Sequence, residues 1–383
     1  MAANTMKVDR FDEWLKDDAD AAALVMRQWL VPVEGKDAVI FPPTYAEPKG
    51  TREGEWLGYN IDTFDDGSNV CQIDSVGSQA NRMEPIFKRD KYKHLVPQVV
   101  VKAGDKKVDL LDAGHRAADA IVRFSTLGPE LHEAFTAFCD SGDAEPLARI
   151  APTSIVFGSW DSRATQAKLP RLVRSVVRAF GVNVMHRSAQ YSTIAGEILE
   201  DGEAEVTTEG PESELGLAHV PAVRTHGGVQ VLGEIRRDAS LNLEVLRALA
   251  ASAGDGDTLS LRRYILGLAL VSLTALQETA LREGCQLVPD TDRRPEWQLV
   301  KHDGARDTVA VDHQQTLDFA TVTAKAFGVA KAKQAQFNAA LARDVLVLSK
   351  DARKKLLRQG PVTEEAIRQV KKKGKAKKTD KEG

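Results

Sequence analysis

Four basic side chains, spaced along one segment, are the clearest candidates for chemistry in this chain. They are Lys168, Arg171, Arg174 and Arg178, and their spacing places them on one face of a helix that we predict over residues 168–180. The other face of that helix would be apolar and would belong to the core, through Leu169, Leu172, Val173, Val176, Val177 and Phe180. Guanidinium groups bind phosphate oxygens through paired hydrogen bonds. The pattern therefore predicts a phosphate-binding face, and a solvated helix face is the alternative.

The absence of acids around this segment favours the phosphate interpretation. Residues 162–196 contain no Asp or Glu, whereas the 55 acids among 383 residues would put about five into a window of that length. A basic segment without neighbouring carboxylates is typical of a site for a polyanion. The net charge of the whole chain, −3, gives no such indication. Positive charge is concentrated in one place instead of being abundant.

The residues before the basic segment could contribute further contacts to a nucleic acid. The sequence Gly158-Ser159-Trp160-Asp161-Ser162-Arg163 combines a glycine and small hydroxyl side chains with an aromatic ring. Glycine and Ser159 would let the backbone approach a phosphate, and Trp160 could stack on a base. A tryptophan in the core is the alternative interpretation for Trp160.

Two predicted helix starts carry side chains that could bind an anion. The first helix begins near residue 74 or 75 and presents Ser78, Gln79 and Arg82 in its first two turns, and the second, over 115–124, begins with His115 and Arg116. The N-terminus of a helix favours an anion because its backbone N–H groups and its dipole point there. Helix capping and ordinary surface polarity are the alternatives at each position.

The remaining elements alternate between strand and helix, which is typical of an α+β or α/β protein. We predict strands over 70–73, 108–111, 154–157, 186–194, 229–236, 286–288 and 297–300, and further helices over 6–29, 241–251, 259–283, 316–327 and 333–348. Residues 34–69 are rich in Gly, Pro and acids and predict an irregular insertion. Residues 200–225 show no helical pattern and predict either a functional protrusion or disorder. The lysine-rich residues 371–383 predict a disordered basic tail.

Several classes of enzyme have no support in the sequence. It contains no phosphate-binding loop of the nucleotide triphosphatases, no dinucleotide-binding glycine motif, no HExxH zinc motif and no GxSxG nucleophile motif. The three cysteines are far apart, so we expect neither a disulfide framework nor a metal site, and we expect no cofactor. No apolar run approaches the roughly 20 residues that cross a bilayer, and no signal peptide is apparent, which fits a reducing cytoplasm.

Four segments together resemble a known protein family. The segments 74–82 (DSVGSQANR), 111–119 (LDAGHRAAD), 157–163 (FGSWDSR) and 188–192 (SAQYS) are similar to the RAMP proteins of type I-G (formerly I-U) CRISPR systems. Those proteins are the Cas-seven-type backbone subunits of the Cascade complex, and the resemblance covers roughly residues 65–345. The resemblance implies an α+β fold with an RRM-like (ferredoxin-like) palm, inserted finger and thumb elements and additional helices.

The same resemblance implies a function in antiviral defence in a prokaryotic cytoplasm. Copies of the protein would polymerise head to tail along a guide RNA (crRNA), together with other Cascade subunits, and support its pairing with target DNA. Gln79, Asn81 and Arg82 would hold the guide backbone, Arg163 and the 168–178 row would line the same groove, and a thumb would lie near residues 200–225. The expected protein is a scaffold without catalytic residues.

These interpretations divide the chain into three parts and leave two other functions open. Residues 1–69 would form an N-terminal helix and a finger-like insertion, residues 70–348 the core with helical additions over 241–348, and residues 349–383 a helix and the basic tail. The first alternative is a metal-independent endoribonuclease that processes CRISPR repeat RNA, with His115 or His186 as general base. The second is a protein whose basic segment binds an acidic protein partner.

Overall fold

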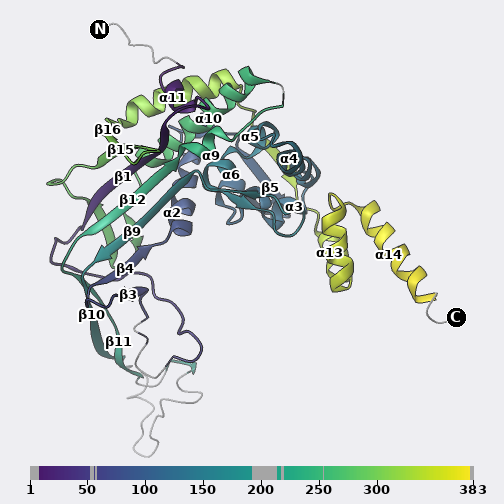
Figure 1. Cartoon of the computed structure of the whole chain (residues 1–383). Helices are drawn as coiled ribbons and strands as arrows, with labels where there is room; N and C mark the ends of the chain where they lie inside the picture. Colours follow the sequence, from purple (N-terminus) through teal and green to yellow (C-terminus); the bar gives the residue numbers. More distant parts are fainter. Residues whose placement is uncertain are drawn as a thin grey trace, which may run out of the picture.

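The largest element of the fold is an antiparallel β-sheet (Figure 1). The computed structural model describes residues 8–51, 56, 58–191, 214–216, 220–252 and 254–379, and its class is mixed α+β. The main path of the sheet runs, in order, through β13 (Ala280–Arg282), β14 (Cys285–Pro289), β1 (Ala21–Pro32), β12 (Ile235–Asn242), β9 (Val173–Phe180), β4 (Asn69–Asp74) and β3 (Ile61–Thr63). Two further strands, β15 (Glu296–Lys301) and β16 (Arg306–Thr308), extend it beside β1.

Strand β1 lies inside this sheet, so the prediction of a helix over 6–29 is wrong. Among residues 8–29, which the structure describes, only α1 (Asp12–Leu15) is helical. Residues 23–30 of β1 pair with β12 on one side, and β14 and β15 pair with successive parts of β1 on the other side. The run Ala21-Ala22-Ala23-Leu24 has a high helix propensity, but ladder hydrogen bonds on both sides outweigh that weak local preference.

Strand β9 replaces the helix that the sequence predicts over 168–180. Residues Lys168–Leu169 form the short strand β8, and Val173–Phe180 form β9, which pairs with β12 and β4. The β-branched side chains of Val173, Val176 and Val177 favour a strand. The small buried residues Ser175 and Ala179 complete the inward face without adding a strong hydrophobic signal, which is why the alternation is hard to see in the sequence.

Helices cover one face of the sheet and leave the other open. Leu24 and Met26 of β1, Leu241 of β12 and Val173 of β9 belong to the same buried core as α10 (Asp255–Thr274) and α11 (His313–Phe327). Helix α2 (Val76–Met83) packs on the same core through Ala80 and Met83. The intervening positions of the strands face the open side.

Some local predictions are confirmed and others are wrong. The strand predicted over 70–73 is β4, and Ser75 caps α2 by accepting a hydrogen bond from the backbone N–H of Ser78 at 3.2 Å. The strand predicted over 154–157 is instead α6 (Pro152–Phe157), every residue of which is buried. A short, fully buried apolar run carries no periodicity that distinguishes helix from strand.

A two-stranded arm extends from the sheet between β9 and β12. Strands β10 (Val182–Tyr191) and β11 (Val220–Val231) pair with each other, β2 (Val39–Ile40) adds to the arm, and Figure 1 shows it projecting beyond β3. Most of the protrusion predicted near 200–225 lies outside the described residues, except 214–216 and the beginning of β11.

The remaining elements form a second region beside the sheet and a C-terminal extension. They are η1 (Glu84–Lys88), η2 (Lys93–Leu95), β5 (Val99–Ala103), β6 (Lys106–Asp109), η3 (Leu110–Asp112), η4 (Arg116–Ala118), α3 (Ala120–Arg123), α4 (Gly128–Ser141), α5 (Glu145–Ile150), β7 (Ser159–Trp160), α9 (Leu243–Arg247), β17 (Lys333–Gln336), α12 (Ala339–Leu346), α13 (Lys350–Gln359) and α14 (Glu364–Thr379). The helix predicted over 333–348 is thus β17, parallel to β5, followed by α12.

The lysine-rich C-terminal segment is helical to Thr379, unlike the disordered tail that the sequence predicts. Helix α14 packs through Ile367 against Leu356 of α13 and Val362. The lysine-rich segment therefore continues a helix whose beginning is held by apolar contacts. Figure 1 shows α13 and α14 standing away from the sheet. None of the helices in the described part of the chain is long and apolar enough to cross a membrane.

A close contact between α10 and α11 yields a prediction about stability. A Cβ atom on Gly267 would lie 2.8 Å from the Cα of Ala320, whereas a Cβ on Gly256, at the start of α10, meets nothing within 4 Å. Gly267→Ala should therefore destabilise the protein by about 1–3 kcal/mol through overpacking, although alanine is the better helix former. Gly256→Ala should be neutral or stabilising, and chemical denaturation of both variants measures the difference. Equal effects of the two substitutions would contradict the close packing.

Candidate nucleic-acid interface

Arg174 and Arg178 lie on the open face of the sheet. They alternate with the buried Ser175, Val177 and Ala179 along β9, so strand geometry, not a helix, places both guanidinium groups on one side. Together with Arg27 of β1 and Arg306 of β16 they line a groove of about 340 Å³. Neither Arg174 nor Arg178 makes an ion pair with a described carboxylate, although Asp238 and Glu296 also line the groove.

Arg27 and Arg306 are groove residues that sequence reasoning missed. Arg27 lies within the segment predicted as a helix, and Arg306 lies beyond the predicted strand over 297–300. In the structure Leu24 and Met26 are buried and Arg27 is exposed, but the apolar Val25 between them hides this alternation in the sequence.

Trp160 and Lys168 continue the basic surface beyond β9. They are directly opposite each other in the β7–β8 pair, and both are exposed, Trp160 to 61%. A tryptophan exposed to this extent does not serve as a core residue. Arg163, in the loop between the two strands, is also exposed.

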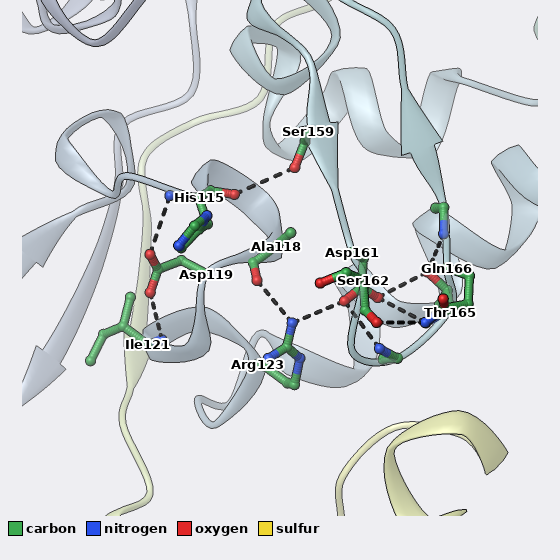
Figure 2. Close-up of polar contacts among 12 residues, drawn as sticks. His115, Ala118, Asp119, Ile121, Arg123, Ser159, Asp161, Ser162, Thr165 and Gln166 are labelled. Carbon is green, nitrogen blue, oxygen red and sulfur yellow. Dashed lines mark hydrogen bonds and ion pairs between the residues drawn. The ribbon is translucent and has the colours of Figure 1, made fainter. Parts of the chain in front are cut away.

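The acid nearest to Trp160 is turned into the protein. Asp161 accepts hydrogen bonds from the backbone N–H and hydroxyl of Thr165, both at 2.9 Å, and from Arg123 at 2.9 Å (Figure 2). Burial by itself would raise its pKa, but these hydrogen bonds and the Arg123 charge hold the pKa of Asp161 below its usual value. Its charge is therefore neutralised internally and does not offset the basic surface outside.

Arg116 is buried at the centre of the site and connects three of its segments. Its guanidinium lies 2.7 Å from Glu84 and donates to the Asn81 side chain at 3.2 Å and to the carbonyl of Gly158 at 3.4 Å. Its own backbone has φ +53°, which is unusual for a residue other than glycine. Only 5% of Arg116 is exposed, so its side chain holds the neighbouring segments in position and does not reach the surface.

Because Gly158 has no side chain, Arg171 packs directly against its backbone, next to the contacts of Arg116. Gly158 has φ +77°, and a Cβ atom there would lie 2.6 Å from Cγ of Arg171. Partial burial and the positive charges of Arg116 and Arg174 lower the pKa of Arg171. Arg171 therefore lies among positive charges, and a bound phosphate would reduce the repulsion between them.

Of the other predicted site residues, those of α2 face mostly inward. Gln79 is buried, where it donates to Asp74 at 2.6 Å and accepts from Ser175 at 2.8 Å. Arg82 is engaged by Asp74, Glu278 and the carbonyl of Leu281. Ser78 is half-buried in the first turn, and Asn81 is exposed. Asn81 connects α2 to the basic surface by accepting a hydrogen bond from Arg116.

The two histidines considered for catalysis lie in different elements. His115 is exposed before η4, and its carbonyl accepts a hydrogen bond from the half-buried Ser159 at 3.4 Å, while its backbone N–H donates to Asp119 (Figure 2). His186 is exposed on β10, opposite His226 of β11. Within the described ranges, no three His, Cys, Asp or Glu side chains come together in a way that could hold a metal ion.

The site therefore consists of an exposed set and a supporting set. The exposed or half-exposed members form a surface that runs from the β7–β8 pair to β9, and we call it the basic row: Trp160, Lys168, Arg171, Arg174 and Arg178. Gln79 and Arg116 support it from within. Chemically, the basic row offers guanidinium groups for phosphates and one indole ring for stacking.

The Arg116–Glu84 pair gives a prediction with a defined pH dependence. Arg116→Met should destabilise the protein by about 3–5 kcal/mol, because it leaves the Glu84 carboxylate buried without its partner. Adding Glu84→Gln should recover part of this loss. Methionine meets the same backbone cost at φ +53° in both variants, so comparing the two isolates the charge.

The pH dependence follows from the direction of the Glu84 pKa shift. Burial raises the pKa of Glu84 to about 7, against the opposing effect of Arg116, and without Arg116 it should rise further. A folded-state pKa above the unfolded value means that the native state holds the proton more tightly, so stability falls as pH rises from about 4.5. Arg116→Met should thus cost more at pH 8 than at pH 5, measured by urea unfolding. The same loss at both pH values would contradict the burial of an unpaired carboxylate.

No curated protein sequence matches this chain. Residues 24–184 match the model of one family, and this span runs from β1 to the start of β10 and contains every residue predicted to bind RNA, whereas His186 lies just beyond it. The family is described as CRISPR-associated protein GSU0053 (Cas_GSU0053), so the matched residues, which are less than half of the chain, are similar to a CRISPR-associated protein.

Proposed function

We propose that this chain is a non-catalytic, guide-RNA-binding backbone subunit of a type I-G CRISPR effector (Cascade). Several copies would assemble head to tail along crRNA and support its pairing with target DNA. The observation that carries the proposal is the basic row, in which four cationic side chains, none of them in an ion pair with a described carboxylate, lie together with an exposed tryptophan.

The topology of the sheet supports an RRM-like palm. In chain order β1, β9, β12 and β15 are the first, second, third and fourth strands of a set whose spatial order is β15–β1–β12–β9, with all neighbours antiparallel. The connections carry α2 between the first two strands and α10 between the last two, on the same face. This fourth–first–third–second order with both helices on one face is the ferredoxin-like arrangement that RRM domains share.

The arm of β10 and β11 is the candidate for the thumb. It joins the second and third strands of the palm and projects from the sheet (Figure 1). A projection at that place could reach a neighbouring subunit or a bound guide strand. We therefore propose that this arm is part of the thumb.

The chemistry of the basic row fits recognition of a strand by its backbone. Arginines and a lysine contact phosphates whatever the sequence, and an indole ring stacks on any base. Specificity would then come from pairing between the guide bases and the target, as in RNA-guided recognition generally. The site needs no nucleophile or metal for this role.

Reversing three charges of the basic row tests the proposal. The variant Arg171→Glu/Arg174→Glu/Arg178→Glu should lose binding to a single-stranded guide RNA, and its residual binding should depend less on salt. The slope of log K against log salt concentration should fall in magnitude by about 2, since three phosphate contacts of about 0.7 each are removed. Filter binding at several salt concentrations measures both quantities.

A matched control distinguishes local contacts from total charge. Lys350→Glu/Lys354→Glu/Lys355→Glu makes the same change on exposed positions of α13, which stands away from β9 (Figure 1). After co-expression with a CRISPR array, the wild type and this control should purify as multi-copy particles with RNA of one length. The basic-row variant should lack that RNA. Equal losses in both variants, or a folded basic-row variant with unchanged affinity, would refute the assignment.

Trp160 gives an independent prediction. Trp160→Ala should weaken RNA binding by about 1–3 kcal/mol, the value of one base–aromatic stack, while Trp160→Phe should keep most of the affinity. Because Trp160 is 61% exposed, neither change should alter the unfolding midpoint much. Fluorescence titration with an RNA oligonucleotide measures the affinities. A full loss with phenylalanine as well would point to the indole N–H and not to stacking.

A further inference from the structure

Arg237 is buried on the helix-covered face of the sheet and has no acidic partner. It alternates along β12 with Arg236 and Asp238, which point to the other side, and only 4% of it is exposed. Its Nε donates to the Ser175 hydroxyl at 2.9 Å. Among the described residues no carboxylate lies within ion-pair distance of it; the nearby Asp74 is engaged by Gln79 and Arg82.

The two terminal nitrogens of Arg237 are only weakly occupied. Nη1 lies 3.5 Å from the Gln28 side-chain oxygen, and Nη2 lies 3.4 Å from the sulfur of Met83. The contact with Gln28 is at the long limit for a hydrogen bond, and the thioether of Met83 is a weak acceptor even at a normal distance. Burial lowers the pKa of Arg237 to about 10, so the group is still charged at neutral pH. A buried, unpaired charge of this kind is costly unless something else compensates it.

A cavity of about 240 Å³ lies beside this guanidinium. Arg237, Gln28 and Gln79 are among the polar residues that line it, and Met26, Leu30 and Leu281 are among the apolar ones. The segment after α10 forms its rim, where Leu276 is 76% exposed and Glu278 is also exposed. The cavity therefore combines one cationic end with mostly apolar walls, as small-ligand sites do.

We propose that this cavity binds a small monocarboxylate with an apolar body, whose carboxylate pairs with Nη1 and Nη2 of Arg237. End-on pairing of a guanidinium with a carboxylate uses two parallel hydrogen bonds, and these are the two nitrogens that lack strong partners. The Gln28 amide nitrogen, which donates to no described residue, is a further donor at the same end.

The lining favours a single negative charge over a phosphate. Arg237 is the only Lys or Arg that lines the described cavity, and burial lowers the pKa of the other basic residue there, His313, so that its ring is neutral at pH 7. The Glu278 carboxylate at the rim would repel a dianion more strongly than a monoanion. Apolar walls then select the body of the ligand, because each buried methylene group adds to the affinity.

This site is separate from the basic row. Ser175, which holds Arg237, points to the helix-covered side of β9, whereas Arg174 and Arg178 point to the open side. Binding in the cavity can therefore be measured without RNA, on the full chain.

Calorimetric titration with sodium hexanoate, against the neutral hexanamide as control ligand, tests the proposal. The wild type should bind hexanoate saturably and hexanamide at least about tenfold more weakly, because only the carboxylate satisfies the guanidinium. Arg237→Met should lose the preference for hexanoate. Leu281→Trp, which keeps Arg237 and fills the cavity, should abolish binding of both.

The outcomes separate a ligand site from a merely structural arginine. If Arg237→Met does not fold, the Leu281→Trp variant and the two-ligand comparison still decide the matter. Absence of hexanoate binding to the wild type, equal binding of hexanamide, or hexanoate binding that survives Leu281→Trp would each overturn the assignment.

Discussion

The two-residue alternation along β9 is the constraint on which most of this structure depends. One face of the strand carries Arg174 and Arg178 to the open side of the sheet, and the other carries Ser175 and Val177 into the core. Ser175 in turn binds both Gln79 and Arg237, so a single small hydroxyl links α2, β9 and β12. A one-residue shift of this strand would exchange the two sets, burying guanidinium groups and exposing the core.

A buried ion pair orders the loops next to that strand. Arg116 reaches Asn81 and Glu84 at the junction of α2 and η1, and the carbonyl of Gly158, so it connects its own segment to two others. Its value lies in geometry more than in net stability, since taking both charges out of water offsets most of their attraction. The gain is that Gly158 and Arg171 are held in a fixed relation to each other, so the cationic groups are arranged before any strand of nucleic acid arrives.

The sequence was sufficient to identify some elements and the important side chains, but not the geometry that joins them. Helix α11 and strand β4 carry clear local patterns, and the cap at Ser75 is visible from residue types alone. By contrast β1 and β9 pair with partners far away in the chain. Local propensity favours helix in β1, and in β9 the spacing of apolar residues fits a helix although its valines favour a strand. The buried hydrogen bond from Ser175 to Gln79, which joins residues 96 positions apart, has no local signal in the sequence either. Exposed arginines such as Arg171 could be found from the sequence because the segment around them contains no Asp or Glu.

The position of β1 in the sheet has a consequence for how the protein is made. Its principal partner, β12, begins roughly 200 residues later, and β15 follows later still. At about 5–20 residues per second, the ribosome needs on the order of 10–40 s to supply the first of these partners. During that interval Leu24, Met26 and Trp29 belong to an apolar strand with both edges unpaired. Newly made chains thus carry an exposed apolar segment until β12 has been synthesised, and slower synthesis lengthens this interval.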